Sequence, residues 1–537
     1  MPVADFFIDK NVFVTGGSGF LGKVLIEKLL RSCPGIGNIY VLLRPKRSKS
    51  IEERLEKVLE SPIFNPLRHQ NPDVFKKLIP IKGDVSELNL GINKEDRELL
   101  VNTVNIIYHS AASVRFDDFL KDAIILNVRG TREVAKLALD LKNISIFVHI
   151  STAYSNCDKL VVEEKLYPAH ANWRDAITIA EECDPKTLQV FSQKYIFPLP
   201  NTYTFAKSLG EHVVNELCQG KIPVVITRPS VVMQTLSEPI QGYIENYNGP
   251  TGLMTALGIG VIRIIYGNRD AVVDYIPADY VIKGIILATE SQRTKKTTSD
   301  NIEIYNMSYN PILRITLEEI MRFGDKLYKE NPYSQMLRHP KVALTENFYK
   351  FYSEVIISHM LPSLLVDLIL RLIGQIPRLV RIQRRIYIAA IVLLPFMTNT
   401  YSLKNDKFLN LQKNLKEEDS AFSYKYLPWT VEERDAYMRS GKLGMEAYLL
   451  KSKSVITGAK AKRQLMNTSH MRPFWVRQQS FYRITSVGRL GWGRRGSCDL
   501  HRLFQGIRQG KSQNLAQQTR NCWYSGNIIG MASQLSN

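Results

Sequence analysis

The sequence predicts an α/β protein with a doubly wound parallel sheet, and two observations carry this prediction. Apolar strand-like runs alternate with helical patterns through the first half of the chain, which is typical of a parallel sheet with helices on both faces. Within residues 11–32, an apolar run ends in a glycine cluster and is followed by apolar residues at helical spacing. A strand, a glycine turn and a helix N-terminus in this order begin the nucleotide-binding half of a Rossmann-type fold.

The expected strands are apolar runs rich in β-branched residues, at 11–16, 38–44, 77–84, 105–112, 145–152 and 223–230. The expected helices between them include 22–32, 51–60, 119–141 and 202–219. Ligands of such sheets bind at the carboxyl ends of the strands. At these ends the chain carries GGSG, RPK, GDV, SAAS and STAY, so we expect the site there.

Three regions are expected along the chain: a catalytic α/β domain over 1–335, a smaller helical domain over 345–451, and a basic tail over 452–537. The formal net charge is +20, and the tail holds fourteen Lys/Arg against one acid, Asp499. The tail has no sustained helical or strand period, which predicts disorder or an atypical chain end. Because most of the positive charge lies in the tail, the rest of the chain is only mildly basic, and we expect no nucleic-acid partner. Acidic partners such as a nucleotide, a coenzyme or a membrane surface fit this charge.

The cysteines, the N-terminal residues and the apolar segments indicate the cellular compartment of the protein. The six cysteines show neither a paired framework nor metal-ligand spacing, which predicts reduced thiols facing the cytosol and no metal site. The first residues lack the basic and apolar regions of a secretory signal. Segment 361–397 is apolar but interrupted by arginines, and its uncharged run 386–397 is too short to span a bilayer. Packed helices and a membrane-surface helix both fit this segment.

A second informative stretch is NTYTFAK, at residues 201–207. Tyr203 and Lys207 are four residues apart in a helical pattern, so they lie on one face of the helix. A nearby cation lowers the pKa of a phenol toward the range useful for proton transfer. The expected strand ending at Ser151 and Thr152 adds a hydroxyl. Together, this hydroxyl, the phenol and the ammonium can bind a carbonyl oxygen and protonate it during hydride transfer.

These features resemble the extended short-chain dehydrogenase/reductase superfamily, and further motifs narrow the resemblance to the fatty acyl-CoA reductases. The motifs are TGGSGFLGKVLIEKLLRSCP, YVLLRPKR, GDVSELNLGI, IYHSAASVRFDD, NVRGTREVAKLA, FVHISTAYSN, PNTYTFAKSLGEHVV and ITRPSVV. The resemblance covers about residues 8–330 and continues more loosely through 345–450. It differs at 399–403 and across the tail, which lacks the apolar C-terminal anchor of many members.

The resemblance implies the site residues. The implied catalytic residues are Tyr203 as the general acid, Lys207 as its partner, and Ser151 or Thr152 as the hydroxyl that binds the carbonyl. Of the last two, Thr152 is favoured. Asn127 either orders a proton-relay water or is a buried structural amide. The implied cofactor-binding residues are Gly16, Gly17, Ser18, Gly19, Phe20, Leu21, Gly22, Arg44, Asp84, Val85, Ala111, Ala112, Asn127, Tyr203, Lys207 and Pro229.

The expected cofactor is NADPH, because the second strand ends in Arg44, followed by Lys46 and Arg47, instead of the acid that binds a ribose 2′-hydroxyl. A solvated basic turn is the alternative. The resemblance implies two hydride transfers that reduce a long-chain acyl-CoA, through an aldehyde, to the fatty alcohol. It also implies attachment to an intracellular membrane, of the endoplasmic reticulum or the peroxisome.

Two other functions remain open from the sequence: a nucleotide-sugar epimerase or dehydratase, and a non-catalytic NADP-binding protein. Segment 248–267, rich in glycine and aliphatic residues, is either the mouth of an acyl tunnel or an ordinary buried helix.

Overall fold

The computed structural model describes residues 2–45, 50–293, 301–309, 312–336 and, apart from Ile373, Asn414 and Tyr426, 342–452. The chain divides into two compact units, Met1–Gly488 and Arg489–Asn537, and the described residues all belong to the first. The expectation of a disordered tail therefore lies, except for Ser452, outside the described residues. The expected boundary near residue 340 stays a prediction.

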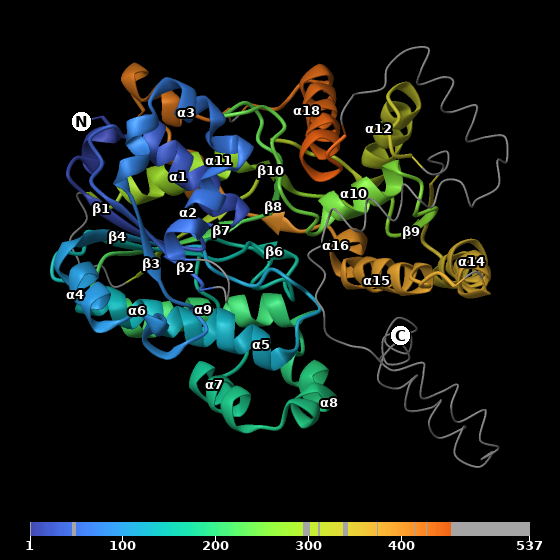
Figure 1. Ribbon diagram of the computed structural model, residues 1–537, viewed down its shortest axis with the longest axis horizontal. Helices are drawn as coiled ribbons and strands as arrows, with labels where there is room; N and C mark the ends of the chain where they lie inside the picture. The colour runs from blue at the N-terminus through green and yellow to red at the C-terminus, as the bar shows by residue number, and fades with distance from the viewer. Residues whose placement is uncertain are drawn as a thin grey trace. The chain divides into compact units, whose positions relative to one another are not determined.

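The centre of the first unit is a parallel sheet of seven strands in the order β11-β7-β5-β4-β1-β2-β3 (Figure 1). From one edge to the other the strands are β11 (Glu303–Met307), β7 (Val224–Pro229), β5 (Ile146–Ile150), β4 (Val104–His109), β1 (Asn11–Thr15), β2 (Ile39–Leu43) and β3 (Leu78–Lys82). Val12 of β1 is paired with Ile39 on one side and Ile106 on the other. The predicted doubly wound Rossmann-type sheet is confirmed.

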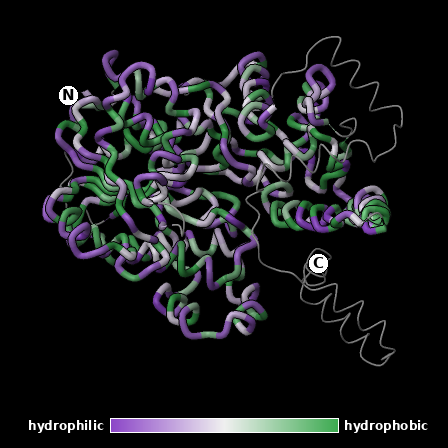
Figure 2. The backbone as a smooth tube through the Cα atoms, in the orientation of Figure 1, coloured by the Kyte–Doolittle hydropathy of each residue, from purple (hydrophilic) through white to green (hydrophobic). Residues whose placement is uncertain are grey.

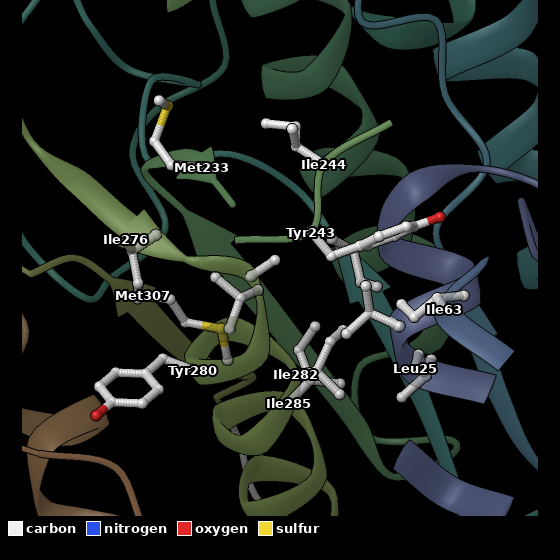
Figure 3. Packing of buried hydrophobic residues seen from close by; sticks show 14 of the residues in the cluster. Leu25, Ile63, Met233, Tyr243, Ile244, Ile276, Tyr280, Ile282, Ile285 and Met307 are labelled. Carbon is white, nitrogen blue, oxygen red and sulfur yellow. The ribbon is translucent and has the colours of Figure 1, made fainter. Parts of the chain in front are cut away.

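Helices cover both faces of this sheet (Figure 1). One face carries α1 (Phe20–Ser32), α2 (Ile51–Leu59) and α11 (Ala278–Glu290), and the other carries α4 (Lys94–Thr103), α6 (Gly130–Asp140) and α9 (Thr202–Cys218). Figure 3 shows part of the first layer, where Leu25, Ile63, Ile282 and Ile285 gather near Tyr243. Because the strands are buried on both faces, they are continuous apolar runs without alternation.

The structure differs from the expected elements in two places. The expected helix 119–141 consists of α5 (Leu120–Ile124), a π-helical turn η5 (Ile125–Arg129) and α6. The edge strand β11, of five residues, was not among the expected strands. Each of the six predicted strands is present with bounds that are shorter or shifted by a residue or two.

Smaller elements extend the unit beyond the sheet. Three two-stranded parallel sheets are β6 (Val161–Val162) with β13 (Ser402–Leu403), β8 (Val231–Met233) with β10 (Tyr275–Pro277), and β9 (Ile264–Tyr266) with β12 (Ala343–Thr345). The remaining helices are α3 (Asn65–Gln70), α7 (Trp173–Glu182), α8 (Pro185–Ile196), α10 (Pro250–Gly258), α12 (Leu317–Glu330), α13 (Phe348–Glu354), α14 (Leu361–Leu372), α15 (Leu379–Val392), α16 (Leu394–Thr398), α17 (Asp406–Asn410) and α18 (Val431–Gly444). Short 3₁₀ and π turns are η1 (Ala4–Phe7), η2 (Pro62–Phe64), η3 (Pro72–Lys77), η4 (Leu88–Gly91), η6 (Val355–Met360), η7 (Glu417–Phe422) and η8 (Met445–Leu449).

A hairpin of α14 and α15 is held together by one buried carboxylate. Asp367 of α14 accepts hydrogen bonds from the backbone N–H groups of Arg378 and Leu379, each at 3.0 Å, and of Val380 at 2.9 Å. It therefore caps the start of α15 from another helix. Among the described residues, one helical stretch, Phe348–Leu372, has the length and apolar composition of a membrane span. This stretch differs from the uncharged run 386–397 considered from the sequence.

Candidate active site

The glycine turn between β1 and α1 has no room for side chains, because segments of the protein backbone approach one another closely there. Gly16 has a φ of +77°, and a Cβ placed on it would lie 2.6 Å from the backbone nitrogen of Ala111. A Cβ on Gly22 would lie 2.3 Å from the carbonyl oxygen of Gly16. Gly19 caps α1 without a side-chain hydrogen bond, so the first N–H groups of the helix remain for an anion such as a pyrophosphate.

The rest of the glycine motif surrounds this turn. Gly17 is buried, and a Cβ on it would lie 2.6 Å from Val41 of β2. Ser18 is exposed, while Phe20 and Leu21 are half-buried at the start of α1. Ala111 and Ala112 are half-buried just beyond the carboxyl end of β4.

A buried histidine links the glycine turn to the opposite layer of helices. The Ala111 N–H donates to the Thr15 hydroxyl at 3.3 Å, which lies 2.7 Å from His109 Nδ1. His109 Nε2 lies 3.0 Å from the Thr131 hydroxyl, which donates to the carbonyl oxygen of Asn127 at 2.8 Å. Burial lowers the pKa of His109 to about 3, so the ring is neutral. Since Thr131 already donates, Nε2 carries the proton and Thr15 donates to Nδ1.

Tyr203, Lys207 and Thr152 come together where β5 meets the start of α9. Asn201 caps α9 by accepting a hydrogen bond from the Thr204 N–H at 2.9 Å, which places Tyr203 in the first turn. The Lys207 ammonium donates to the carbonyl oxygen of Ile150 at 2.7 Å. The Thr152 hydroxyl hydrogen-bonds the Tyr203 phenol, and the Phe116 ring lies 5.4 Å from the Tyr203 ring.

The pKa values in this cluster differ from the expectation. Burial raises the pKa of Tyr203 to about 12, although the hydrogen bond from Thr152 opposes the rise. Burial also lowers the pKa of Lys207 to about 8, against the negative charge of Glu211. The expected lowering of the phenol pKa by Lys207 was wrong, because the ammonium is held by a backbone carbonyl and burial dominates the phenol.

Ser151 and Thr152, which the sequence left as alternatives, have different partners. The Ser151 hydroxyl donates to Glu211 at 2.5 Å. Glu211 also forms a two-pronged ion pair with Arg228, at 2.6 Å and 2.9 Å, and both side chains are almost completely buried. Burial raises the pKa of Glu211, and Arg228 outweighs this effect, so that the pKa is lowered. Thr152 is therefore the hydroxyl that contacts the phenol, and Ser151 belongs to the Glu211 network.

The Asn127 side chain is fully engaged within the described structure. Its carbonyl oxygen accepts from the Ser113 N–H at 2.8 Å, and its amide donates to the Ser113 carbonyl at 3.0 Å. Asn127 lies in the π-helical turn η5, 1 % exposed. These contacts favour the structural amide over a side chain that orders a water.

Two arginines lie beyond the end of β2, Arg44 directly after the strand and Arg54 in α2, and the sequence analysis named only Arg44. Arg44 Nε lies 2.8 Å from Asp84 Oδ2, and the Arg44 side chain is 58 % exposed. Arg54 of α2 is close enough for the Arg44 charge to lower its pKa, in addition to burial. Its buried Nη1 has no hydrogen-bond partner among the described residues. Lys46 and Arg47 lie outside the described residues.

The remaining cofactor candidates also lie at this edge of the sheet. Val85 is buried beside α6, where a Cβ on Gly130 would lie 2.8 Å from its carbonyl oxygen. Pro229 ends β7, and its carbonyl oxygen accepts from the Ala153 N–H at 2.9 Å. The open N-terminus of α1 and the exposed Gly19 beside it fit a dinucleotide cofactor.

Sequence reasoning missed Arg54, Glu211 and Arg228. Glu211 follows Lys207 by one helical turn, so the spacing of Tyr203, Lys207 and Glu211 on one face could have indicated it. Arg54 follows Arg44 by ten residues and is half-buried in α2, and no sequence pattern singled it out. No sequence signal pairs Arg228 with Glu211, because β7 and α9 meet only in the fold.

Comparison with known proteins gives the family of the chain. Two models, both described as male sterility protein, match residues 14–285 and 358–452. Fatty acyl-CoA reductase 1 of Pongo abelii is 35% identical over 471 residues, covering 87% of this chain and 89% of the relative. Fatty acyl-CoA reductase wat of Drosophila melanogaster is 35% identical over 454 residues, covering 84% of this chain and 86% of the relative.

Solved structures share the fold. The terminal R domain of the myxalamid PKS-NRPS pathway has a TM-score of 0.55 at 17% identity, covering 83% of this chain and 93% of that chain. A nonribosomal peptide synthetase reductase domain from Mycobacterium tuberculosis has a TM-score of 0.54 at 20% identity, covering 81% of this chain and 91% of that chain. The sequence relatives decide the family, and this chain is an oxidoreductase that belongs to the fatty acyl-CoA reductases.

Proposed function

We propose that the protein reduces long-chain fatty acyl-CoA to the primary alcohol in two steps, with NADPH as the hydride donor and with release of CoA. The observation that carries the proposal is the cluster of Tyr203, Thr152 and Lys207 at the carboxyl edge of the sheet, which the glycine turn shares. A neutral phenol held by a hydroxyl is a proton donor and an oxyanion binder at the same point.

In this proposal NADPH supplies a hydride to the carbonyl carbon in each step. Hydride addition places negative charge on the carbonyl oxygen, which Thr152 and Tyr203 hydrogen-bond and which Tyr203 protonates to give a hemithioacetal. Tyr203 then takes this proton back as the C–S bond breaks, the CoA sulfur leaves as the thiolate and is protonated from solvent, and an aldehyde remains. In the second step Tyr203 again gives its proton to the oxygen, which becomes the alcohol. The Lys207 ammonium provides a positive charge near the phenol, and it can hydrogen-bond the ribose of the cofactor.

The test is NADPH consumption with a panel of acyl-CoAs, with products identified by mass. The parent protein is expected to form fatty alcohol, and Tyr203→Phe is expected to lose about a hundredfold or more of kcat, because general acid catalysis contributes that much. Tyr195→Phe, a change of the same kind on α8, is the matched control. If the protein binds NADPH but consumes none with any acyl-CoA, the proposal is wrong, and a sugar substrate or a non-catalytic role is favoured.

NADPH is preferred to NADH because of the charges at the end of β2. The phosphate on the ribose is a dianion, and Arg54 Nη1 is buried without a partner among the described residues. Leaving such a group unsatisfied is unfavourable, so a 2′-phosphate that accepts from it is favoured. Arg44 lies beside it and is exposed.

We also propose that the α14–α15 hairpin contacts an anionic intracellular membrane, of the endoplasmic reticulum or the peroxisome. Its apolar side chains are half or more exposed at Leu364, Leu365, Leu368 and Leu372, and Figure 2 shows hydrophobic colour along both helices. Exposed arginines flank them at Arg371, Arg381, Arg384 and Arg385. Exposed apolar residues next to cations are typical of helices that lie in a membrane interface.

A further inference from the structure

The turn that follows β5 is held on both sides of Thr152 by one carboxylate. The Ser155 N–H donates to the carbonyl oxygen of Thr152 at 3.1 Å, and the Tyr154 N–H donates to the Thr152 hydroxyl at 3.3 Å. The hydroxyls of Ser151 and Ser155 both donate to Oε1 of Glu211, at 2.5 Å and 2.9 Å. One oxygen atom of Glu211 therefore fixes the two serines that flank this part of the turn.

Glu211 lies on the same helix as Tyr203 and Lys207. It follows Lys207 by four residues in α9, so the two side chains are neighbours on the surface of the helix. The Lys207 ammonium donates to the carbonyl oxygen of Ile150 at 2.7 Å, and Glu211 accepts from the hydroxyl of the next residue, Ser151. The helix that carries Tyr203 is therefore joined to the end of β5 through two consecutive residues.

Arg228 of β7 fixes the orientation of the Glu211 carboxylate. Its Nε donates to Oε1 at 2.9 Å, and its Nη2 donates to Oε2 at 2.6 Å. Its Nη1 donates to the carbonyl oxygen of Glu163 at 3.2 Å, so the guanidinium is itself held in place. Both side chains of the ion pair are almost completely buried, and water does not compete for these bonds. The carboxylate therefore has one fixed position between β5, β7 and α9.

The negative charge of Glu211 also acts on Lys207. Burial lowers the pKa of Lys207 to about 8, and the charge of Glu211 opposes this effect. Burial raises the pKa of Glu211, but Arg228 outweighs this rise, so that the carboxylate stays ionised. If the charge of Glu211 is removed, the pKa of Lys207 is expected to fall further, and the ammonium is then lost at a lower pH.

Lys207 is otherwise surrounded by groups that are neutral or already paired. His109 of β4 and His149 of β5 are fully buried, and burial lowers the pKa of both rings. Burial raises the pKa of Tyr203, which therefore keeps its proton near neutral pH. Arg228 of β7 is paired with the carboxylate of α9. This carboxylate therefore supplies the negative charge that stabilises the Lys207 ammonium.

We propose that Glu211 is a positioning residue for the reduction, which holds the turn of Thr152 against α9 and provides the counter-charge of Lys207. A hydroxyl that binds a developing oxyanion is effective only when it is held in place beforehand. Because Glu211 is buried, it acts on the site through its neighbours. This inference rests on the proposed reduction of acyl-CoA, and it adds how the carbonyl-binding hydroxyl is placed and how the ammonium keeps its charge.

A second buried ion pair provides the matched control. The Lys442 ammonium of α18 lies 2.5 Å from the Glu446 carboxylate of η8, and both side chains are almost completely buried. Glu446 also accepts a hydrogen bond from the Ser334 N–H at 3.2 Å. Glu446→Gln therefore removes a buried, hydrogen-bonded carboxylate in the same way as Glu211→Gln, but in elements outside the cluster of Tyr203.

The experiment measures kcat and KM with palmitoyl-CoA and NADPH from pH 6 to pH 10. Ser151→Ala combined with Ser155→Ala is expected to lower kcat about tenfold and to leave KM for NADPH within about twofold, because the Thr152 hydroxyl is misplaced in the transition state. The pH at which kcat/KM for NADPH falls is expected to stay the same in this double serine variant, since Glu211 keeps its charge.

Glu211→Gln is expected to lower kcat by at least the same factor and to move the alkaline fall of kcat/KM for NADPH to a pH about one unit lower. Glu446→Gln is expected to change neither. If Glu211→Gln does not fold, Glu211→Gln combined with Arg228→Gln takes its place, because it leaves no unpaired buried charge. The proposal is overturned by an unchanged kcat in the double serine variant, by an unshifted alkaline fall in the Glu211 variant, or by the same shift in Glu446→Gln.

NADPH binding, followed by fluorescence from pH 6 to pH 10, separates this inference from the proposed function. If the parent protein reduces no acyl-CoA, the proposed function fails, and NADPH binding that weakens at a lower pH in Glu211→Gln than in the parent protein still supports the action of Glu211 on Lys207. If the parent protein reduces palmitoyl-CoA and the variants match it in kcat and in pH profile, the role of Glu211 fails while the proposed function stands.

Discussion

Lys207 is buried and Tyr203 is half-buried, and the loss of solvent moves their pKa values in opposite directions. The pKa of the phenol is raised to about 12 and that of the ammonium is lowered to about 8, because burial disfavours whichever form is charged. Near neutral pH the pair is therefore a neutral phenol and a cation. The phenol keeps its proton over the whole range in which the enzyme is usually assayed, and Lys207 is the member that titrates.

The first prediction concerns pH. Since the Lys207 ammonium is present below its pKa and lost above it, kcat/KM for NADPH is expected to fall as pH rises through about 8. Lys207→Arg is expected to move this fall to higher pH, since a guanidinium stays charged. Steady-state kinetics from pH 6 to pH 10 check both. A flat profile to pH 10 in the parent protein would contradict the assignment.

The second prediction concerns the ribose phosphate. Arg54→Ala is expected to raise KM for NADPH about tenfold or more, because it removes a charge-assisted hydrogen bond, and to leave KM for NADH unchanged. Arg97→Ala is the control, since Arg97 pairs with Asp140 on the α4–α6 surface. Kinetics with both dinucleotides measure the effect. An equal rise in both KM values would show that Arg54 acts on the fold and not on the phosphate.

At the scale of elements, the helix α9 shows how one face organises the site. Tyr203, Lys207 and Glu211 are spaced by four residues and point to the end of β5, where they meet Thr152, Ile150 and Ser151 in that order. Glu211 is held by Arg228 of β7. Removing one partner of a buried ion pair usually costs about 3–5 kcal/mol, because it leaves an unpaired buried charge, so a substitution of Glu211 or Arg228 alone is expected to destabilise the packing of α9 on the sheet.

The third prediction concerns the α14–α15 hairpin. Leu364→Glu with Leu368→Glu is expected to abolish sedimentation with vesicles that contain phosphatidylserine, because two charges replace the apolar contact. Val190→Glu is the matched control, since Val190 of α8 is an apolar side chain that is 81 % exposed elsewhere on the unit. Vesicles of phosphatidylcholine alone are expected to bind the parent protein more weakly. Equal sedimentation of all three proteins would refute the contact.

At the scale of the whole molecule, the regular part of the fold could be predicted and its outer part could not. The strands of the sheet are buried on both faces, so their apolar runs and the glycine turn stand out in the sequence. The strand β11 and the short paired strands β6 and β13 have little local signal, because they depend on partners far along the chain. Helix 119–141 is interrupted at η5, where Asn127 hydrogen-bonds the backbone of Ser113, and no helical pattern in the sequence indicates this contact.

The site was predicted in the same uneven way. Tyr203, Lys207 and the glycines follow local spacing, so they stand out in the sequence, and their roles stay predictions. The choice of Thr152 over Ser151 depends on Glu211 and Arg228, which meet only once β5, β7 and α9 are assembled. The misjudged pKa of Tyr203 has the same origin, because the depth of burial is a property of the assembled layers and not of the tyrosine–lysine spacing.

The short helix α16 lies in a chain of aromatic contacts that ends at Tyr203. Phe396 of α16 packs against Phe116, and Phe116 packs against Tyr203, with ring centroids 5.6 Å and 5.4 Å apart. If a ligand that binds at Tyr203 changes the packing of these rings, its binding is coupled to α16, and thermodynamic linkage makes that coupling reciprocal. A substitution in α16 would then change ligand affinity at the tyrosine by the same factor by which the ligand changes the stability of the α16 packing.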